Sequence, residues 1–185
     1  MGDSSKASDS SPAALGFLTV VENEQIGLVG GYLILNTTGR PLEFHCTAPV
    51  KPSRAQQILF GPTLTPYLYG EQIAQSLIQK GALEPLVVWT DQAAVLAARS
   101  FVLYPLALFV AEDLVLDEAR RHFDTPLEFA VGVRRAAVLS DATADKTLVL
   151  DRMAGLENFD LNEPFGRIRE AIEEAHRSAG ARQAA

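Results

Sequence analysis

The stretch RPLEFHCTAPVKPSRAQ, residues 40–56, contains side chains that could act as a nucleophile, a base or an acid. Cys46 is the only cysteine of the chain; it directly follows His45, and Glu43 lies two positions before that histidine. A thiol activated by an imidazole is a catalytic nucleophile, and a carboxylate beside an imidazole can carry out general acid–base catalysis. These three residues are therefore the first candidates for a reactive site.

Strand geometry separates the thiol from the imidazole. Residues 40–47 follow a Thr-Gly turn and are rich in apolar types, which predicts a β-strand. Because successive side chains of a strand point to opposite faces, Cys46 shares one face with Leu42 and Phe44, while Glu43 and His45 share the other. We expect Cys46 to be a buried core residue. Glu43 and His45 either line a small hydrolytic site or belong to the solvent-facing side of a sheet.

A second polar group precedes a short helix predicted over residues 54–60. Ser53 suits the N-cap position, and Lys51 and Arg54 lie on either side of it. The amide groups of a helix start, with two cations beside them, can bind a phosphate or a carboxylate. The alternative is that Ser53 only caps the helix and that both cations are solvated.

Asp91 follows residues 85–90, whose bulky apolar side chains at successive positions predict a strand buried on both faces. Ligands of α/β sheets often bind at the ends of such strands, which makes Asp91 a third candidate. It is also a good N-cap for the Ala-rich helix predicted over residues 92–99, and that role explains it without a ligand.

Motifs for metals, nucleotides and acyl transfer are absent from the sequence. The three histidines, His45, His122 and His176, lie on distant segments without the paired spacing of zinc sites. Neither the glycine-rich phosphate loops nor the G-x-S-x-G nucleophile elbow occurs. The sequence therefore predicts no cofactor and no metal, and it favours a protein without catalytic activity.

The elements that must position these residues follow from apolar patterning. Residues 16–23, 27–37 and 40–47 predict three strands whose connections are too short for a parallel crossover. Helices are predicted over residues 54–60 and 66–80, and further strands over residues 85–90, 101–110 and 127–139. This order predicts a single α+β domain, in which an N-terminal antiparallel β-meander of three strands continues into a mixed sheet packed by helices.

Glycine and proline modify three of the predicted strands. Gly30 and Gly31, inside the second strand, indicate a bulge or the close approach of another element. Pro105 removes a backbone donor and argues for an edge position or a bulge in residues 101–110. Gly132 indicates a bend in residues 127–139.

The last predicted element is an amphipathic helix. Apolar residues recur at helical spacing, and charged residues occupy the other faces; the apolar positions are Leu161, Phe165, Ile168, Ile172 and Ala175. Such a helix usually closes the core of its own domain. The alternative is an interface, for which Phe165, Ile168 and Ile172 would be the partner-binding residues.

Composition limits the classes of partner. The formal net charge of −7 and the absence of a basic stripe predict no nucleic-acid partner. The apolar run over residues 93–111 is interrupted by Arg99 and Pro105, which predicts no membrane span. A single cysteine and an N-terminus unlike a signal peptide predict a cytoplasmic protein. A disordered N-terminal tail is expected over residues 1–14 and a frayed C-terminal tail over residues 179–185, around a single domain over residues 15–178.

These observations predict a non-enzymatic cytoplasmic domain for protein interaction, an adaptor that binds another protein or forms a homodimer. The alternative hypothesis is a small hydrolase with a polar site around Glu43 and His45.

Overall fold

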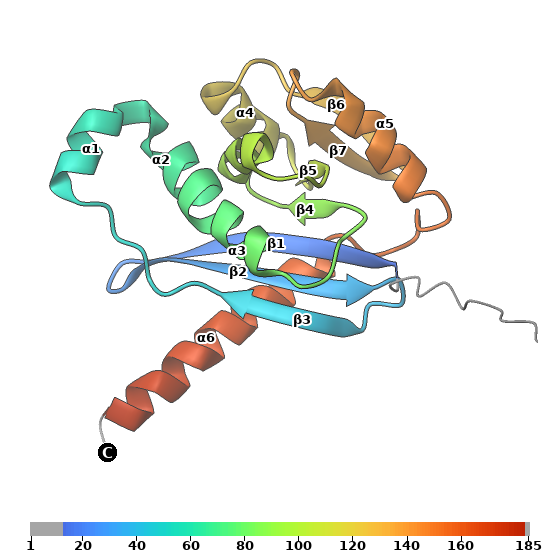
Figure 1. Ribbon diagram of the computed structural model, residues 1–185. Helices are drawn as coiled ribbons and strands as arrows, with labels where there is room; N and C mark the ends of the chain where they lie inside the picture. The colour runs from blue at the N-terminus through green and yellow to red at the C-terminus, as the bar shows by residue number, and fades with distance from the viewer. Residues whose placement is uncertain (1–12, 184–185) are drawn as a thin grey trace, which may run out of the picture.

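The computed structural model describes residues 13–183, which form a seven-stranded sheet with helices on both faces (Figure 1). The strands lie in the order β3-β2-β1-β4-β5-β7-β6. Their bounds are β1 (Ala14–Asn23), β2 (Gly27–Asn36), β3 (Pro41–Cys46), β4 (Val88–Thr90), β5 (Leu106–Val110), β6 (Leu127–Val131) and β7 (Arg134–Val138).

The sheet is mixed, as the sequence predicted. Strand β2 pairs antiparallel with β1 and β3, which confirms the meander. Strands β1, β4 and β5 run parallel to one another, and β7 pairs antiparallel with β5 and β6. The predicted α+β class is therefore confirmed. Its physical basis is the shortness of the first two connections, because neither can carry a parallel crossover.

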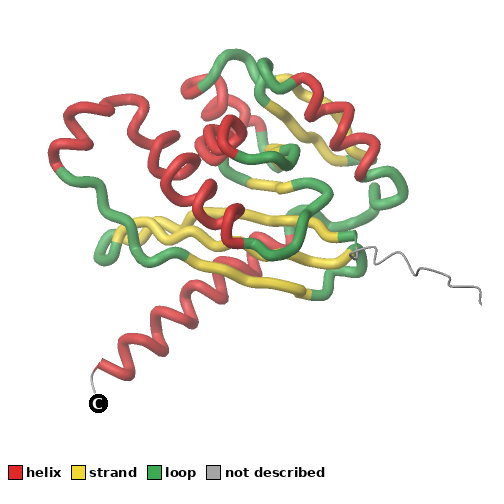
Figure 2. The backbone as a smooth tube through the Cα atoms, viewed as in Figure 1, coloured by secondary structure: helices red, strands yellow, loops and turns green. Residues whose placement is uncertain are grey.

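Helical segments occupy most of the remaining chain (Figure 2). They are α1 (Arg54–Phe60), η1 (Gly61–Thr63), α2 (Leu64–Pro66), η2 (Tyr67–Ala74), α3 (Gln75–Lys80), η3 (Ala93–Phe101), α4 (Asp113–His122), α5 (Thr143–Arg152) and α6 (Glu163–Gln183). Segments η1 and η3 are 3₁₀ helices, and η2 is π-helical.

The helices form two layers, one on each face of the sheet. Segments η2, α3, η3 and α4 pack on one face, in a core that includes Leu18, Ile73 and Leu96. Helices α5 and α6 pack on the other face, in a core that includes Trp89 and Phe165. Figure 1 shows α6 crossing the sheet on the side opposite to α2 and α3. The predicted C-terminal amphipathic helix thus covers β1 and β2 of the meander on this face.

Two adjacent glycines allow both layers to approach β2 closely. A Cβ atom on Gly30 would lie 2.1 Å from Cγ2 of Ile73 in η2, and one on Gly31 would lie 2.3 Å from Cγ2 of Ile168 in α6. The prediction of close approach at these positions is confirmed, and it applies to opposite faces because the two residues alternate. The register shift in this hairpin lies elsewhere, between Ile34 and Leu35.

Two sequence expectations about the second half of the chain were wrong, and two helices were missed. Residues 127–139 are not one bent strand but the hairpin β6–β7, with Gly132 in the turn at φ +60°. Pro105 does not lie inside a strand, because β5 begins at the next residue and runs in the middle of the sheet. Helices α4 and α5, each ten residues long, were not predicted.

The limits of the predicted domain differ from those of the helices and strands. The predicted N-terminal tail, residues 1–14, lies outside the described residues except for its last two, and Ala14 already belongs to β1. At the other end, α6 continues to Gln183, past the predicted boundary at residue 178. Within residues 13–183, no helix combines the length and apolar character that crossing a membrane requires.

Candidate functional site

The parallel strands β1, β4 and β5 end at the same edge of the sheet. From β1 the chain continues into β2 on one side, whereas from β4 it continues through η3 into β5 on the other. The strand order therefore reverses between β1 and β4. A crevice outside the carboxyl ends of such a strand pair is where open α/β sheets bind ligands. Asp91 directly follows β4 and therefore lies at this end of the strand pair.

Gln92 bridges the gap between the ends of these two strands. Its Nε2 donates to the carbonyl oxygen of Val20 at 2.9 Å, and its Oε1 accepts the Val20 amide at 2.6 Å. The fully buried Thr19 hydroxyl lies 3.3 Å from the same Oε1. The Gln92 side chain thus bonds to β1 as a peptide group of a neighbouring strand would, and it fixes the segment after β4 to β1.

Asp91 forms an ion pair with Arg169 of α6. The Arg169 Nη2 donates to Oδ2 of Asp91 and also lies 3.4 Å from Oγ1 of Thr19. The Asp91 side chain is 16% exposed and that of Arg169 43%. The predicted capping role of Asp91 is wrong, because Gln92 occupies the N-cap position of η3 and that helix start has no side-chain cap. Asp91 instead holds α6 to the end of β4.

Glu43 and His45 share a face of β3, as predicted, with His45 Nε2 3.0 Å from Glu43 Oε2. This face is turned toward the loop after α3, whose Ala82 amide donates to Glu43 Oε2 at 3.0 Å. Burial alone would raise the Glu43 pKa, but hydrogen bonds from His45 and from the amides of Ala82 and Leu83 outweigh it and hold the pKa below its ordinary value. The pair therefore anchors this loop, and the hydrolytic role hypothesised for it stays a prediction.

The prediction that Cys46 is a core residue was wrong. Cys46 is exposed, and Leu42 and Phe44 on the same face are 36% and 40% exposed. Strand β3 lies at the edge of the sheet, and α6 covers β1 and β2 on this face. Alternation was predicted correctly, but the strand pattern does not reveal which face another element will cover.

Ser53 is the N-cap of α1, as one of the two hypotheses held. Its Oγ accepts the Gln56 amide at 3.2 Å, and its own amide donates to the Gln56 side chain at 2.9 Å. Lys51 Nζ donates to the Gln25 carbonyl, and Arg54 donates to a glutamine one turn further along α1. Because these polar groups bond within the protein, their arrangement does not favour an anion site.

The candidate partner-binding residues of α6 lie in the core. Phe165 and Ile168 are completely buried and Ile172 is 2% exposed, in the cluster between α6 and the sheet. Helix α6 therefore closes its own domain, and these three side chains offer no surface to a partner.

A cleft of about 630 Å³ lies at the carboxyl end of β1, between the β1–β2 turn, η2 and α4. We call it the acidic cleft, because Glu22, Glu24 and Glu118 line it and Lys51 is the cation among its lining residues. Tyr69 of η2 forms part of the wall. Burial, followed by the charges of Glu22 and Glu118, raises the pKa of Tyr69 to about 12.

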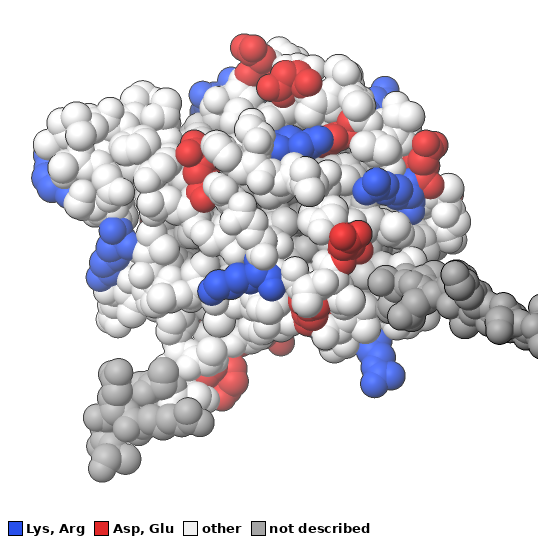
Figure 3. Space-filling view, in the orientation of Figure 1, with Lys and Arg blue, Asp and Glu red and all other residues white. Residues whose placement is uncertain are grey.

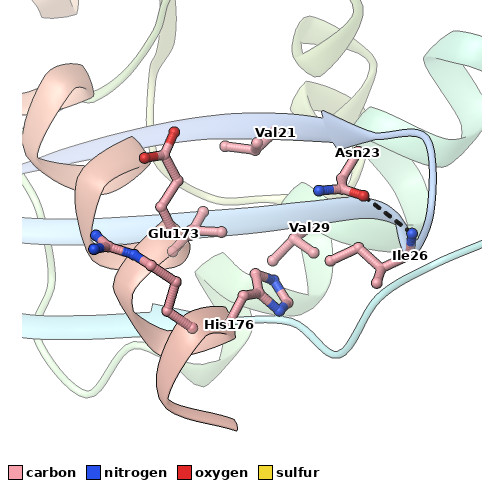
Figure 4. Close-up of a pocket in the computed structure, with 8 residues that line it drawn as sticks. Val21, Asn23, Ile26, Val29, Glu173 and His176 are labelled. Carbon is pink, nitrogen blue, oxygen red and sulfur yellow. Dashed lines mark hydrogen bonds between the residues drawn. The ribbon is translucent and has the colours of Figure 1, made fainter. Parts of the chain in front are cut away.

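A smaller cavity of about 270 Å³ lies on the opposite face, between residues 172–177 of α6 and the β1–β2 hairpin (Figure 4). Val21 and Val29 supply apolar walls, and His176 points from α6 toward the hairpin. Asn23 Oδ1 accepts the Ile26 amide at 3.2 Å, so this oxygen is used within the turn. The cavity offers mainly apolar surface to a ligand.

Positive and negative side chains are interspersed over the face shown in Figure 3. Arginines of the two Arg-Arg sequences make ion pairs: Arg120 with Glu128, and Arg135 with Asp113 and Glu128. These cations are therefore neutralised locally.

The sequence did not indicate Arg169, Glu118 or Tyr69 as site residues. Arg169 is one of several charges on the polar side of α6, and Glu118 lies on a helix that was not predicted. Of the glutamates that line the acidic cleft, only Glu22 stood out in the sequence, because it ends the apolar pattern of the first strand. The grouping of these residues depends on where α4, η2 and α6 pack.

No model of a protein family matches this sequence, and no curated protein matches it either. Among solved structures, the fold is similar to the crystal structure of human ENDOV, with a TM-score of 0.44 and 12% identity over 92% of this chain and 87% of that one. Two crystal structures of Ciona intestinalis endonuclease V in complex with inosine-containing DNA give TM-scores of 0.34 and 0.33, at 17% and 15% identity. They match 63% of this chain and 58% and 59% of theirs.

These neighbours contradict three predictions made from the sequence. They are endonucleases, and two of them were solved with DNA, whereas the sequence predicted a non-enzymatic adaptor, a protein partner or homodimer, and no nucleic-acid partner. We withdraw those predictions. With TM-scores below 0.5, these neighbours assign no activity to this chain.

Proposed function

We propose that this protein binds a small organic cation, such as a polyamine, in the acidic cleft. The observation that carries the proposal is the charge of the lining: three carboxylates, Glu22, Glu24 and Glu118, face one ammonium group, that of Lys51. A cleft lined by one sign of charge concentrates ligands of the opposite sign. The excess of carboxylates therefore favours a cation.

The ammonium group of Lys51 does not cancel this charge at the centre of the cleft. Its Nζ donates to the carbonyl oxygen of Gln25 in the β1–β2 turn, which holds it at one side. Glu118 reaches the cleft from α4 and is partly buried. A ligand amine between Glu22 and Glu118 would therefore have two carboxylate partners, one from each wall.

Tyr69 gives the cleft an aromatic surface suited to a cation. With its pKa raised to about 12 by burial and by the nearby carboxylates, the phenol is neutral at physiological pH. A neutral ring attracts an amine through its negative π face, and the hydroxyl can still donate a hydrogen bond. Leu64 and Leu68 add apolar wall that suits the methylene groups of an aliphatic polyamine.

The position of the cleft supports the proposal. It borders the carboxyl end of β1, next to the point where the strand order reverses. The side chains of Gln92 and Arg169 occupy that point itself.

Isothermal titration of the purified full chain with spermidine tests the proposal. We expect binding that weakens about two- to five-fold in Glu22→Gln and in Glu118→Gln, as for the loss of one partly exposed charge contact. Tyr69→Leu should weaken binding while keeping the apolar wall. Glu170→Gln, an exposed change on α6 with the same effect on net charge, should leave binding unchanged.

Two results would contradict the proposal. One is the absence of any heat of binding with spermidine, putrescine or arginine. The other is an equal loss of affinity in Glu170→Gln and Glu118→Gln, which would mean that the ligand responds only to the net charge of the protein.

We further propose a cytoplasmic location. The exposed Cys46, the only cysteine of the sequence, cannot form an intramolecular disulfide, and a reducing compartment would keep its thiol unmodified.

A further inference from the structure

We infer that the crevice between the carboxyl ends of β1 and β4 is closed by the guanidinium group of Arg169, which occupies the place that a divalent metal ion would need. Metal-dependent hydrolysis of phosphodiesters uses one or two such ions, clamped by carboxylates that converge on a small volume. A metal site at this crevice would therefore need several carboxylates that converge on one point.

The set of metal donors at the crevice is too small. Asp91 supplies a carboxylate, but the residue facing it on β1 is Thr19, and α6 contributes Arg169. Across residues 13–183, no group of three or more His, Cys, Asp or Glu side chains lies close enough together to hold a metal ion. Mg²⁺ and Mn²⁺ prefer several oxygen ligands, of which carboxylates carry the compensating charge.

One oxygen atom of Asp91 is available as a ligand for a cation. Oδ1 of Asp91 is buried and has no hydrogen-bond partner among the described residues. The other oxygen, Oδ2, already accepts from Arg169, so a metal ion would gain one oxygen ligand and would lie beside a positive charge. Repulsion between a dication and a guanidinium at contact distance opposes binding. The attraction of one further carboxylate oxygen does not offset this repulsion.

Arg169 is held in this place by the packing of its helix. The neighbouring Ile168 and Ile172 lie against Gly31, so closely that a Cβ there would be 2.3 Å from one and 3.0 Å from the other. Helix α6 therefore has no room to shift toward β2. On the strand side, Gln92 is bonded to both the amide and the carbonyl of Val20. Opening the crevice would require breaking the ion pair.

The inference is tested by Mn²⁺ titration of four full-length proteins: wild type, Asp91→Asn, the double variant Thr19→Asp/Arg169→Asn, and that double variant with Asp91→Asn added. Calorimetry measures binding, and the shift in Tm on adding Mn²⁺ provides a second readout. Circular dichroism verifies that each variant is folded. We expect no binding and no Tm shift for the wild type.

The double variant replaces the cation by an amide and adds a second carboxylate beside Asp91. We expect Mn²⁺ to bind this variant and to raise its Tm. EDTA should reverse the rise in Tm, and the added change Asp91→Asn should abolish both the binding and the rise. Metal binding by the wild type that Asp91→Asn abolishes would overturn the inference. So would a folded double variant that binds no Mn²⁺, because the guanidinium would then not be what excludes the ion. If the double variant does not fold, Arg169→Asn alone takes its place: it must bind Mn²⁺ more tightly than the wild type, and equal absence of binding in both would overturn the inference. Neither outcome depends on whether the acidic cleft binds polyamines.

Discussion

Replacing Gly31 by alanine should force α6 away from β2. The added Cβ would lie 2.3 Å from Cγ2 of Ile168 and 3.0 Å from Cδ1 of Ile172, whereas carbon atoms in contact are about 3.5–4.0 Å apart. Ile168 would have to retreat by about 1.2 Å or more. Overpacking of this kind costs about 1–3 kcal/mol, and the gain from replacing a strand glycine offsets about 0.5–1 kcal/mol of it.

The expected net effect of Gly31→Ala is a loss of about 1–2 kcal/mol in the free energy of unfolding, which corresponds to a fall in Tm of about 2–8 °C for a chain of this size. Urea unfolding followed by circular dichroism measures it. Gly166→Ala on α6 is the matched control, because nothing lies within 4 Å of the Cβ it would add. That change should stabilise the helix by up to about 1 kcal/mol.

A double-mutant cycle identifies the contact responsible. Ile168→Ala by itself should cost about 2–5 kcal/mol through the cavity it leaves. In the presence of Ala at position 31, the new methyl group fills part of that cavity, so the combined loss should be smaller than the sum by about 1 kcal/mol. Additive losses, or a Gly31→Ala variant as stable as the wild type, would show that α6 does not press on β2 as described.

Three further predictions concern other parts of the chain. Asp145→Asn should lower the free energy of unfolding by about 3 kcal/mol, because it removes the buried partner of Arg99, whereas the exposed Asp141→Asn should change it little; urea unfolding of both variants measures this. The Glu43 pKa is lower in the folded protein than its ordinary value of 4.5, so its contribution to stability is present above that value and is lost as the pH falls through the folded pKa. The stability difference between wild type and Glu43→Gln should accordingly be full at pH 7 and shrink below pH 4.5, and a difference independent of pH would refute it. Cys46 should react with a thiol reagent in the native protein about as fast as in urea, and marked protection would contradict its exposure.

The elements with strong local signals were predictable. The three strands of the meander have apolar, β-rich sequences and short connections, and α6 has a sustained apolar spacing. The pair Gly30 and Gly31 correctly indicated close approach. Helices α4 and α5 have only ten residues each, about three turns, and were missed. The turn at Gly132 was taken for a bend because a tight hairpin and a bent strand have similar patterns.

The candidate site was less predictable than the fold. Asp91 was noticed because it follows a buried strand, but its partner Arg169 lies 78 positions away on the polar side of a helix. No local pattern connects residues at that distance. Glu43 and His45 were correctly placed on one face, yet the sequence could not indicate that the loop after α3 would cover them.

By itself, the sequence determined which segments become strands and helices and which side chains share a face, because those properties depend on residues only a few positions apart. The tertiary structure decided which face of each element became covered. Phe44 and Cys46 are exposed because α6 covers β1 and β2 and leaves the edge strand open. Asp91 has a cationic partner because the same helix places Arg169 at the end of β4. Both outcomes depend on the path of one helix across the sheet, which is fixed by packing between residues far apart in the chain.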